Sequence, residues 1–193
     1  MQLKDAGWYA EHGIDLRTGI DVLSLDREAK TARLSDHSDL PYDLLTLVTG
    51  SRPFVPPIEG SDLPGVHVYR TIADLEEIIK ASAGKSSAVV IGGGLLGLEA
   101  AQAVQSLGLS AGIVERAAFL MPQQLNEDAS ALLQEKVEDQ DIRLFLGKDS
   151  TTIRKDDQGL HLDFEPDEST NCDLVIISAG ITPSDHLALS LIH

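Results

Sequence analysis

A glycine-rich turn between a short apolar run and a longer periodic run constrains the fold of this chain more than any other feature. Residues 88–91 are continuously apolar, which is typical of a strand buried on both faces of a parallel sheet. Gly92, Gly94 and Gly97 follow at once in the spacing G-x-G-x-x-G. Apolar residues then recur at helical spacing until Gly108, a typical helix stop. The segment therefore predicts a strand, a turn and a helix in direct succession.

A second predicted strand, residues 111–114, ends at Glu115, about twenty residues beyond the turn, where an acidic side chain can reach an adenosine ribose. In such a βαβ unit the glycines allow a tight turn, a close approach of pyrophosphate and close helix–strand packing. The helix N-terminus adds positive potential. The unit therefore predicts dinucleotide binding. Glu115 favours NAD(H), because a carboxylate repels the 2'-phosphate of NADP(H), although the adjacent Arg116 could pair with that phosphate.

The following residues predict the rest of a Rossmann-type domain. Thr71 is a candidate cap for a short helix at 72–80 ahead of the first strand, and Asn126 for a helix behind the second. We expect the buried stripe of the latter helix to hold its apolar residues Leu132, Leu133 and Val137. Residues 142–146 are a predicted third strand.

After Gly147 the apolar period changes from 3.6 to 2, with turn signals at 156–159 and 165–167. This pattern predicts a β-meander that leads into the apolar strand 173–178. The predicted fold class is thus α/β, a Rossmann-type three-layer dinucleotide-binding domain with a β-meander.

An internal repeat connects this domain with the start of the chain. Ile14-Asp15-Leu16 matches residues 142–144. Further matches join Asp43, Leu44, Gly50 and Pro53 to Asp173, Leu174, Gly180 and Pro183. The repeat predicts a helix at 3–11, a strand at 14–17, a meander at 22–34 and an apolar strand at 44–48. The first copy has no glycine turn ahead of it, so we expect a fragment lacking the first half of its leading nucleotide-binding domain.

The composition limits the classes of partner. With 42% apolar residues among 193, the chain can bury a core. A formal net charge of -16 repels phosphate backbones and anionic lipid, so nucleic acid is not an expected partner. No apolar run reaches the roughly eighteen residues that span a bilayer, and no secretion signal opens the chain. We therefore expect a cytoplasmic protein without a membrane partner.

The chain offers few groups for other chemistry. Cys172 is the single cysteine, and its place before an apolar run predicts a buried structural thiol. The six histidines show no metal spacing, so no metal is expected. No catalytic constellation can be recognised, and hydride transfer requires none because the cofactor carries the reaction. We therefore assign no catalytic residue.

Two features leave alternatives open. Glu99 follows the glycines in a segment otherwise made of Leu and Ala, and is either an exposed helix residue or a hydrogen-bond partner for the nicotinamide end of the cofactor. Trp8 and Tyr9 could form a stacking platform, but on a helix that leads into a strand such residues are more often core or interface. We assign no site to them.

Together these segments resemble the FAD-dependent pyridine nucleotide (disulfide) oxidoreductases, a family of two-domain flavoprotein reductases. The resemblance rests on residues 89–101, on the strand ends at 47–50 and 177–180, and on the duplicated layout. Segments 53–60, 68–71, 92–101 and 120–125 look most like the NADH- and FAD-binding portion of the NAD(P)H-dependent nitrite reductase large subunits within that family. Rubredoxin and ferredoxin reductases are near relatives.

The resemblance implies a domain division and residue roles. Residues 1–52 would be the C-terminal part of an incomplete FAD-binding domain, 53–66 a Pro-rich connector, 67–183 the NAD(H)-binding Rossmann domain, and 184–193 a truncated return segment. The prolines and glycines of residues 51–66 themselves predict an ordered connector that follows an extended path without helix or sheet pairing. Contacts to NAD(H) are implied for Gly92, Gly94, Leu96, Gly97, Glu99, Glu115, Gly180 and Ile181. A place along FAD is implied for Val22, Thr49, Gly50 and Arg52.

Three hypotheses on function follow. The first is a fragment, inactive alone, of an enzyme that passes hydride from NADH to FAD and electrons onward to an acceptor domain or protein, ultimately to nitrite. The second keeps the flavoprotein but makes the acceptor rubredoxin, ferredoxin or oxygen. The third is a non-catalytic NAD(H)-binding module. Apolar faces exposed by a truncated domain could also pair two copies into a homo-oligomer.

Overall fold

The chain forms two compact units in its computed structural model, which describes residues 4–157, 159–165 and 168–191. One unit comprises Met1–Gly50 with Pro183–His193, and the other comprises Ser51–Thr182. The units are described separately below.

A five-stranded parallel sheet forms the centre of the Ser51–Thr182 unit, in the strand order β5-β12-β6-β7-β8. Its strands are β5 (Val66–Val68), β6 (Ser87–Ile91), β7 (Ser110–Glu115), β8 (Arg143–Leu146) and β12 (Leu174–Ile177). Residues 88–91 of β6 are buried along their whole length, as expected for a strand covered on both faces. The parallel sheet that the apolar runs predicted is thus confirmed.

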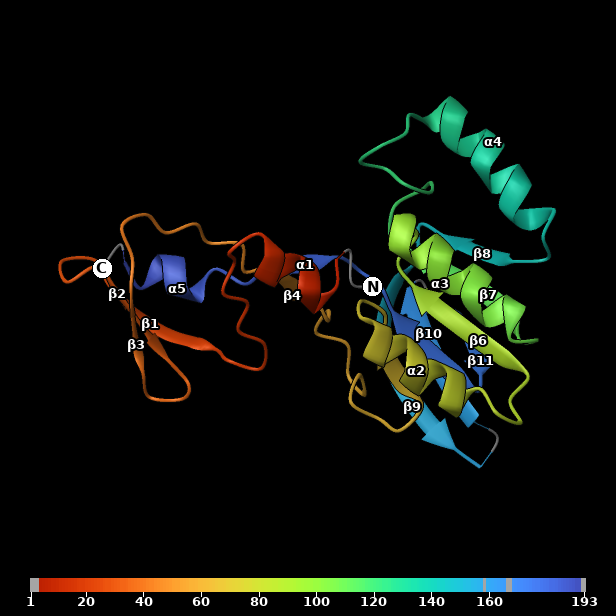
Figure 1. Cartoon of the computed structure of the whole chain (residues 1–193). Helices are drawn as coiled ribbons and strands as arrows, with labels where there is room; N and C mark the ends of the chain where they lie inside the picture. Colours follow the sequence, from red (N-terminus) through yellow and green to blue (C-terminus); the bar gives the residue numbers. More distant parts are fainter. Residues whose placement is uncertain (1–3, 158, 166–167, 192–193) are drawn as a thin grey trace. The chain divides into compact units, whose positions relative to one another are not determined.

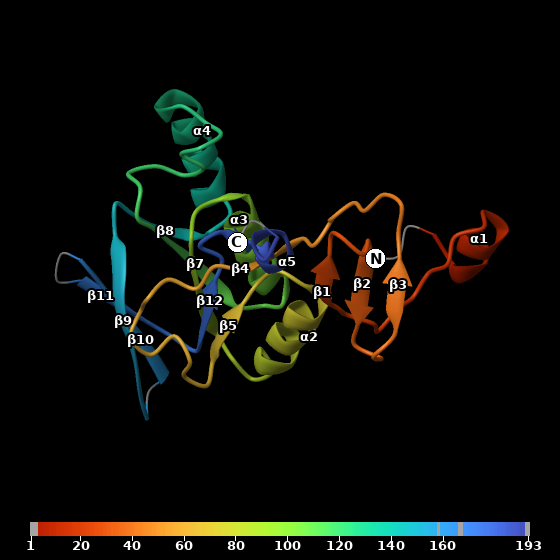
Figure 2. The same ribbon diagram turned by 90° about the vertical axis from the view of Figure 1, so that its left-hand side faces the viewer.

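Helices cover one face of this sheet and a second sheet covers the other (Figures 1 and 2). The helices are α2 (Ile72–Ala81), α3 (Leu95–Ser106) and α4 (Glu127–Glu138). The second sheet is the antiparallel meander of β9 (Asp149–Asp156), β10 (Gly159–Glu165) and β11 (Glu168–Cys172). Alternate residues of β6 divide between the layers, because Val90 packs with the helices and Val89 with the meander. The predicted three-layer fold with a meander is confirmed.

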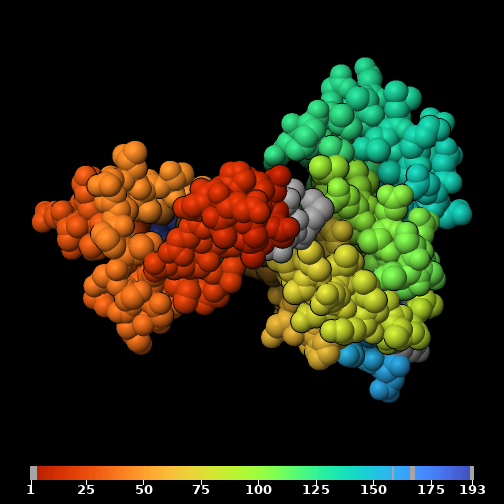
Figure 3. Space-filling view, viewed as in Figure 1, coloured from red at the N-terminus to blue at the C-terminus, as the bar shows by residue number. Residues whose placement is uncertain are grey.

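The capping residues in the sequence correctly predicted where α2 and α4 of this unit begin. Thr71 caps α2 and Asn126 caps α4, each through its side-chain oxygen, as predicted. In the space-filling view, the yellow to teal segments that include these helices form most of the visible surface of the unit (Figure 3). The predicted stripe of α4 was wrong in one position, because the side chain of Leu132 is 66% exposed while Val137 is buried. Turn residues 158 and 166–167 lie outside the described residues.

The Pro-rich stretch is ordered, as the sequence indicated, but part of it pairs with another strand. Its first residues form β4 (Ser51–Pro53), which pairs with β13 (Ile181–Pro183) in a two-stranded sheet. Further along, Ile58 is buried and the Glu59 carbonyl accepts a 2.7 Å hydrogen bond from the Ile153 amide of the meander. The expectation of a connector without sheet pairing was therefore wrong. Contacts with the meander, which lies far away in sequence, fix its path.

The other unit contains an antiparallel sheet in the order β1-β2-β3 and two short helices. These elements are β1 (Val22–Asp26), β2 (Thr31–Leu34), β3 (Asp39–Pro41), α1 (Ala6–Glu11) and α5 (His186–Leu189). The meander predicted at residues 22–34 is confirmed, and β3 extends it by a third strand beyond the predicted residues. The N-terminal helix begins at Ala6 with Asp5 as its cap, and the predicted start at Leu3 lies outside the described residues. Residues 184–191 belong to this unit, where Leu187 is buried.

The strands predicted at 14–17 and 44–48 are absent from the structure, and this prediction was wrong. Leu44 is 93% exposed and Val48 is 87% exposed. A parallel strand needs a neighbour that completes its hydrogen bonds. Within the described residues no strand pairs with either segment, so their apolar pattern alone does not produce a sheet.

No helix among the described residues has both the length and the apolar character required to cross a bilayer.

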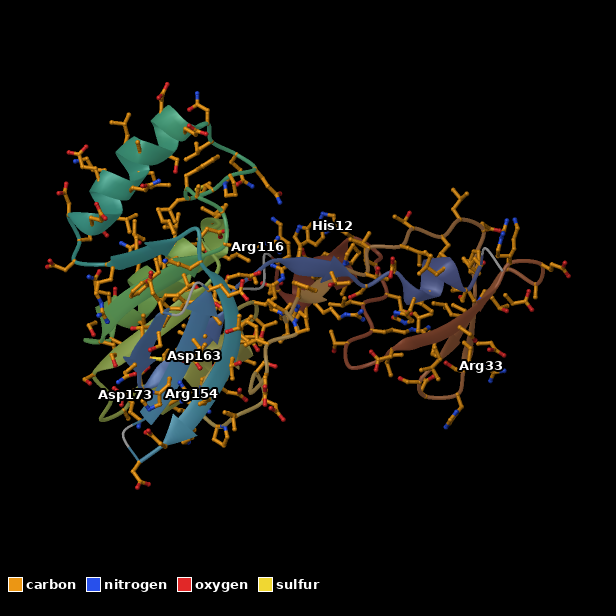
Figure 4. The ribbon with its side chains drawn as sticks, turned by 180° about the vertical axis from the view of Figure 1, so that it is seen from behind. His12, Arg33, Arg116, Arg154, Asp163 and Asp173 are labelled. Carbon is orange, nitrogen blue, oxygen red and sulfur yellow. The ribbon has the colours of Figure 1, made fainter. Side chains whose placement is uncertain are left out.

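Asp173 joins the amino ends of β12 and β6 (Figure 4). One of its carboxylate oxygens accepts hydrogen bonds from the backbone N–H of Ser86 and Ser87 at 2.9 and 3.1 Å and from both of their hydroxyls. The backbone bond from Ser86 is the largest influence that lowers the pKa of Asp173 below its ordinary value of 3.8. The ionised form is thus the one that the fold stabilises.

We predict that Asp173→Asn lowers the free energy of unfolding by about 2 kcal/mol at neutral pH, because hydrogen bonds to a charged acceptor are lost. A lowered folded pKa gives a contribution present above pH 3.8 and lost as the pH falls through the lowered value. The difference between variant and wild type should therefore shrink in acid. Urea unfolding at several pH values measures it. Asp43→Asn, at the exposed repeat counterpart, is the control, and equal effects of both variants would contradict the prediction.

Candidate functional site

The glycine turn lies where the order of strands in the parallel sheet reverses. From β6 the chain passes through α3 to β7 on one side, whereas β12 lies on the other side of β6. Ligands of open α/β sheets bind at such a switch point, outside the carboxyl ends of the strands. Gly92 leaves β6 and Gly180 follows β12 at this edge. The topology therefore brings the two predicted glycine positions to the edge at which open α/β sheets bind their ligands.

Two glycines of the turn are required by packing. Gly92 has a φ of +115°, and a Cβ there would lie 2.4 Å from the Ser178 carbonyl oxygen at the end of β12. A Cβ on Gly97 would lie 1.9 Å from the Gly92 carbonyl oxygen. Neither position has room for a side chain, because the opposing atoms are backbone.

Gly94 differs from both. Among the described residues, a Cβ built on it meets no atom within 4 Å beyond its chain neighbours, and its φ is -81°, so the position is open and the backbone unstrained. It is also the N-cap of α3, and no side chain caps that helix, whereas Thr71 and Asn126 cap α2 and α4. The first amides of α3 are therefore left for an external acceptor. An anion fits this cradle, because the helix N-terminus carries positive potential.

Glu115 stands beside the turn at the end of β7. Its carboxylate accepts a hydrogen bond from the Gly93 amide at 2.6 Å and another from the Ala117 amide at 2.7 Å. A carboxylate has about four lone-pair positions, so acceptor capacity remains for hydroxyl groups of a ligand. Arg116, the next residue, is exposed at the same end of the sheet (Figure 4). The carboxylate of Glu115 thus lies beside the glycine turn, as its spacing in the sequence predicted.

The other residues implied for NAD(H) lie at this edge or on the first turns of α3. Leu96 is half-buried and Glu99 is exposed on α3. Gly180 has a φ of +119°, and the side chain of Ile181 is 52% exposed. The sequence assigned no structural role to Leu120 and Met121, which contact the turn from the segment after β7. The additional glycine at 93 is the sequence signal for this contact, because a Cβ there would lie 2.8 Å from a methyl carbon of Leu120.

The residues implied for FAD divide between the two units. Val22 opens β1 and is half-buried, while Thr49 and Gly50 are exposed at the end of the first segment of the same unit. Arg52 is exposed in β4 and belongs to the Ser51–Thr182 unit. In the described part of Met1–Gly50 no strand leads through a glycine turn into a helix, so these residues do not by themselves form a dinucleotide cradle.

Cys172 is confirmed as a buried thiol, with 5% of its surface exposed. Burial raises the pKa of this thiol to about 12, so it stays protonated near neutral pH and is a poor nucleophile. Within residues 4–157, 159–165 and 168–191, no group of three or more His, Cys, Asp or Glu side chains is arranged to hold a metal ion.

Comparison with known proteins gives a family match over nearly the whole chain. The family model for the pyridine nucleotide-disulphide oxidoreductases matches residues 4–191. The large subunit of nitrite reductase [NAD(P)H] from Klebsiella oxytoca is 43% identical over 190 residues, which are 98% of this chain and 20% of that protein. Nitrite reductase [NAD(P)H] from Bacillus subtilis is 41% identical over 97% of this chain and 23% of its own length. The chain thus spans about a fifth to a quarter of these relatives.

Solved structures show the same fold. The ferredoxin reductase for the CYP199A2 system of Rhodopseudomonas palustris superposes with a TM-score of 0.92 at 25% identity, over 98% of this chain and 47% of that chain. The water-forming NADH oxidase of Lactobacillus brevis, solved bound to NADH, gives a TM-score of 0.84 at 26% identity, over 94% of this chain and 41% of that one.

Proposed function

Because the chain belongs to the pyridine nucleotide-disulphide oxidoreductase family, as its sequence predicted, we propose that its Ser51–Thr182 unit binds NAD(H) at the switch point beside β6 and β12. The observation that carries this proposal is the open position of Gly94 between two glycines that packing requires. A phosphate approaches the backbone there and accepts hydrogen bonds from the uncapped first amides of α3.

The remaining residues orient the two ends of the dinucleotide. Glu115, held by the Gly93 and Ala117 amides, accepts hydrogen bonds from the adenosine ribose and disfavours a 2'-phosphate. Leu96, Glu99, Gly180 and Ile181 form the nicotinamide side, where Glu99 is the hydrogen-bond partner. The chemistry that such a cofactor supplies is hydride transfer. The protein's task is to hold the nicotinamide in a fixed orientation.

We further propose that the chain is a part of a flavoprotein that passes the hydride of NAD(P)H to FAD and electrons onward to nitrite. Support comes from the nitrite reductases that match nearly all of this chain. Val22, Thr49, Gly50 and Arg52 would be this chain's share of the FAD site, completed by other parts of the parent protein. A cluster that reduces nitrite needs several thiolate ligands, so Cys172 alone does not provide it. The chain alone should therefore be inactive.

A ferredoxin or a related protein is the alternative electron acceptor, favoured by the structural match to a ferredoxin reductase. A role as a non-catalytic NAD(H)-binding module is a further alternative. The cytoplasmic location, the homo-oligomer and the absence of a nucleic-acid partner stay predictions from the sequence.

Calorimetric titration of the purified chain with NADH, NADPH and FAD, each at the same moderate salt concentration, tests the proposal. We expect saturable binding of NADH, weaker binding of NADPH because of Glu115, and little binding of FAD. Absence of binding by both nicotinamide nucleotides would refute the assignment of the switch point. Tight FAD binding would refute the view that the flavin site depends on further parts of the parent protein.

A further inference from the structure

Gly93, the variable residue between the first two glycines of the turn, is held from several directions. Its N–H donates to Glu115, and its carbonyl accepts a 3.0 Å hydrogen bond from the Met121 amide. A Cβ added to Gly93 would lie 2.8 Å from a methyl carbon of Leu120 and 2.9 Å from the Cβ of Glu115. The glycine at this position thus allows the segment after β7 to pack directly against the turn.

That segment, residues 117–125, is itself attached to α4. The hydroxyl of Ser130 donates a 2.9 Å hydrogen bond to the Leu120 carbonyl, and both residues are 0% exposed. Gln134, one turn further along α4, donates to the Ser130 hydroxyl at 3.2 Å. Met121 adopts a φ of +51°, which is uncommon for a residue with a long side chain. The packing of Leu120 and its bond to Ser130 hold the segment in this conformation.

Because the peptide bond is planar, fixing the Gly93 carbonyl also fixes the direction of the Gly94 N–H on the opposite side of the turn. In a trans peptide the carbonyl of one residue and the N–H of the next point in opposite directions. Because Met121 fixes the Gly93 carbonyl, it also directs the Gly94 N–H away from segment 117–125. Gly94 is the open position over which the phosphate is proposed to lie. An amide fixed in advance binds an anion at a lower entropic cost.

We propose that Ser130, acting through Leu120 and Met121, is a positioning residue for the glycine turn, and that α4 thereby sets the affinity of the site for dinucleotide phosphates. The proposal rests on NAD(H) binding at the switch point. It assigns a role in binding to a buried serine whose hydroxyl bonds to Leu120 and Gln134.

The test compares Ser130→Ala with Ser82→Ala in the full chain. Ser82 is a matched control, because it is also buried and its hydroxyl donates to a backbone carbonyl, that of Ile78 in α2 at 2.7 Å. Calorimetry should show NADH binding weakened about three- to tenfold by Ser130→Ala, the effect of one hydrogen bond, and unchanged by Ser82→Ala. Thermal unfolding of both variants measures the purely structural cost.

A second readout on the nucleotide-free chain separates this proposal from the proposed function. In amide hydrogen exchange, the Met121 and Gly93 N–H groups should exchange faster in Ser130→Ala than in wild type or Ser82→Ala. Unchanged exchange, or equal weakening of NADH binding by both variants, would overturn the positioning role. If wild type binds no NADH, the proposed function fails, and changed exchange would then show the coupling of α4 to the turn without any role in binding.

Discussion

Replacing Gly94 with alanine is expected to weaken NADH binding about 10- to 100-fold. The free energy of unfolding should fall by no more than about 1 kcal/mol, because alanine is a poorer N-cap than glycine. Beyond the neighbouring residues in the chain, the added methyl group meets no atom of the described part of the protein within 4 Å, so the fold accommodates it. It occupies the space through which a phosphate reaches the first amides of α3, and hydrogen bonds between those amides and a charged group would be lost.

Calorimetry with NADH and thermal unfolding, measured on the same preparation, check this prediction. Binding equal to that of wild type would show that no phosphate approaches Gly94. A loss of binding together with an equal loss of stability would show that the position is structural, as Gly92 and Gly97 are.

Replacing Gly97 with alanine is expected to lower the free energy of unfolding by about 3 kcal/mol or more. Helix propensity alone predicts the opposite sign, because alanine is about 1 kcal/mol better than glycine inside a helix. The steric term decides, since the new Cβ would lie 1.9 Å from the Gly92 carbonyl oxygen, a backbone atom that cannot move without shifting β6 or α3.

Urea unfolding followed by circular dichroism measures the effect of Gly97→Ala, with Gly94→Ala as the matched control in the same turn. Stability equal to or above that of wild type would mean that propensity outweighs packing. In that case α3 and β6 can move apart to accept a side chain at position 97.

Much of the Ser51–Thr182 unit could be predicted from local patterns. The apolar run 88–91 predicted a strand buried on both faces, and Thr71 and Asn126 predicted the starts of α2 and α4. Such signals depend on groups close together in the chain, including a side-chain oxygen and an amide three residues on. They hold wherever the segment lies in the fold.

Predictions of strands and of burial were wrong where the outcome depends on residues far away in the sequence. The segments 14–17 and 44–48 have the apolar content of strands, but a strand requires a hydrogen-bonding partner that local sequence does not specify. Leu132 follows the helical period and is nevertheless exposed, because the width of the buried stripe depends on how α4 packs against its neighbours.

The sequence by itself determined the family, the order of elements in the nucleotide-binding unit and the glycine turn with Glu115, because spacing along the chain sets each of them. Only the tertiary structure decided which glycine is open and which are packed, and that Leu120 and Ser130 support the turn. The physical reason is that these properties arise from atoms of β12, segment 117–125 and α4, which the fold brings to the turn from distant parts of the sequence.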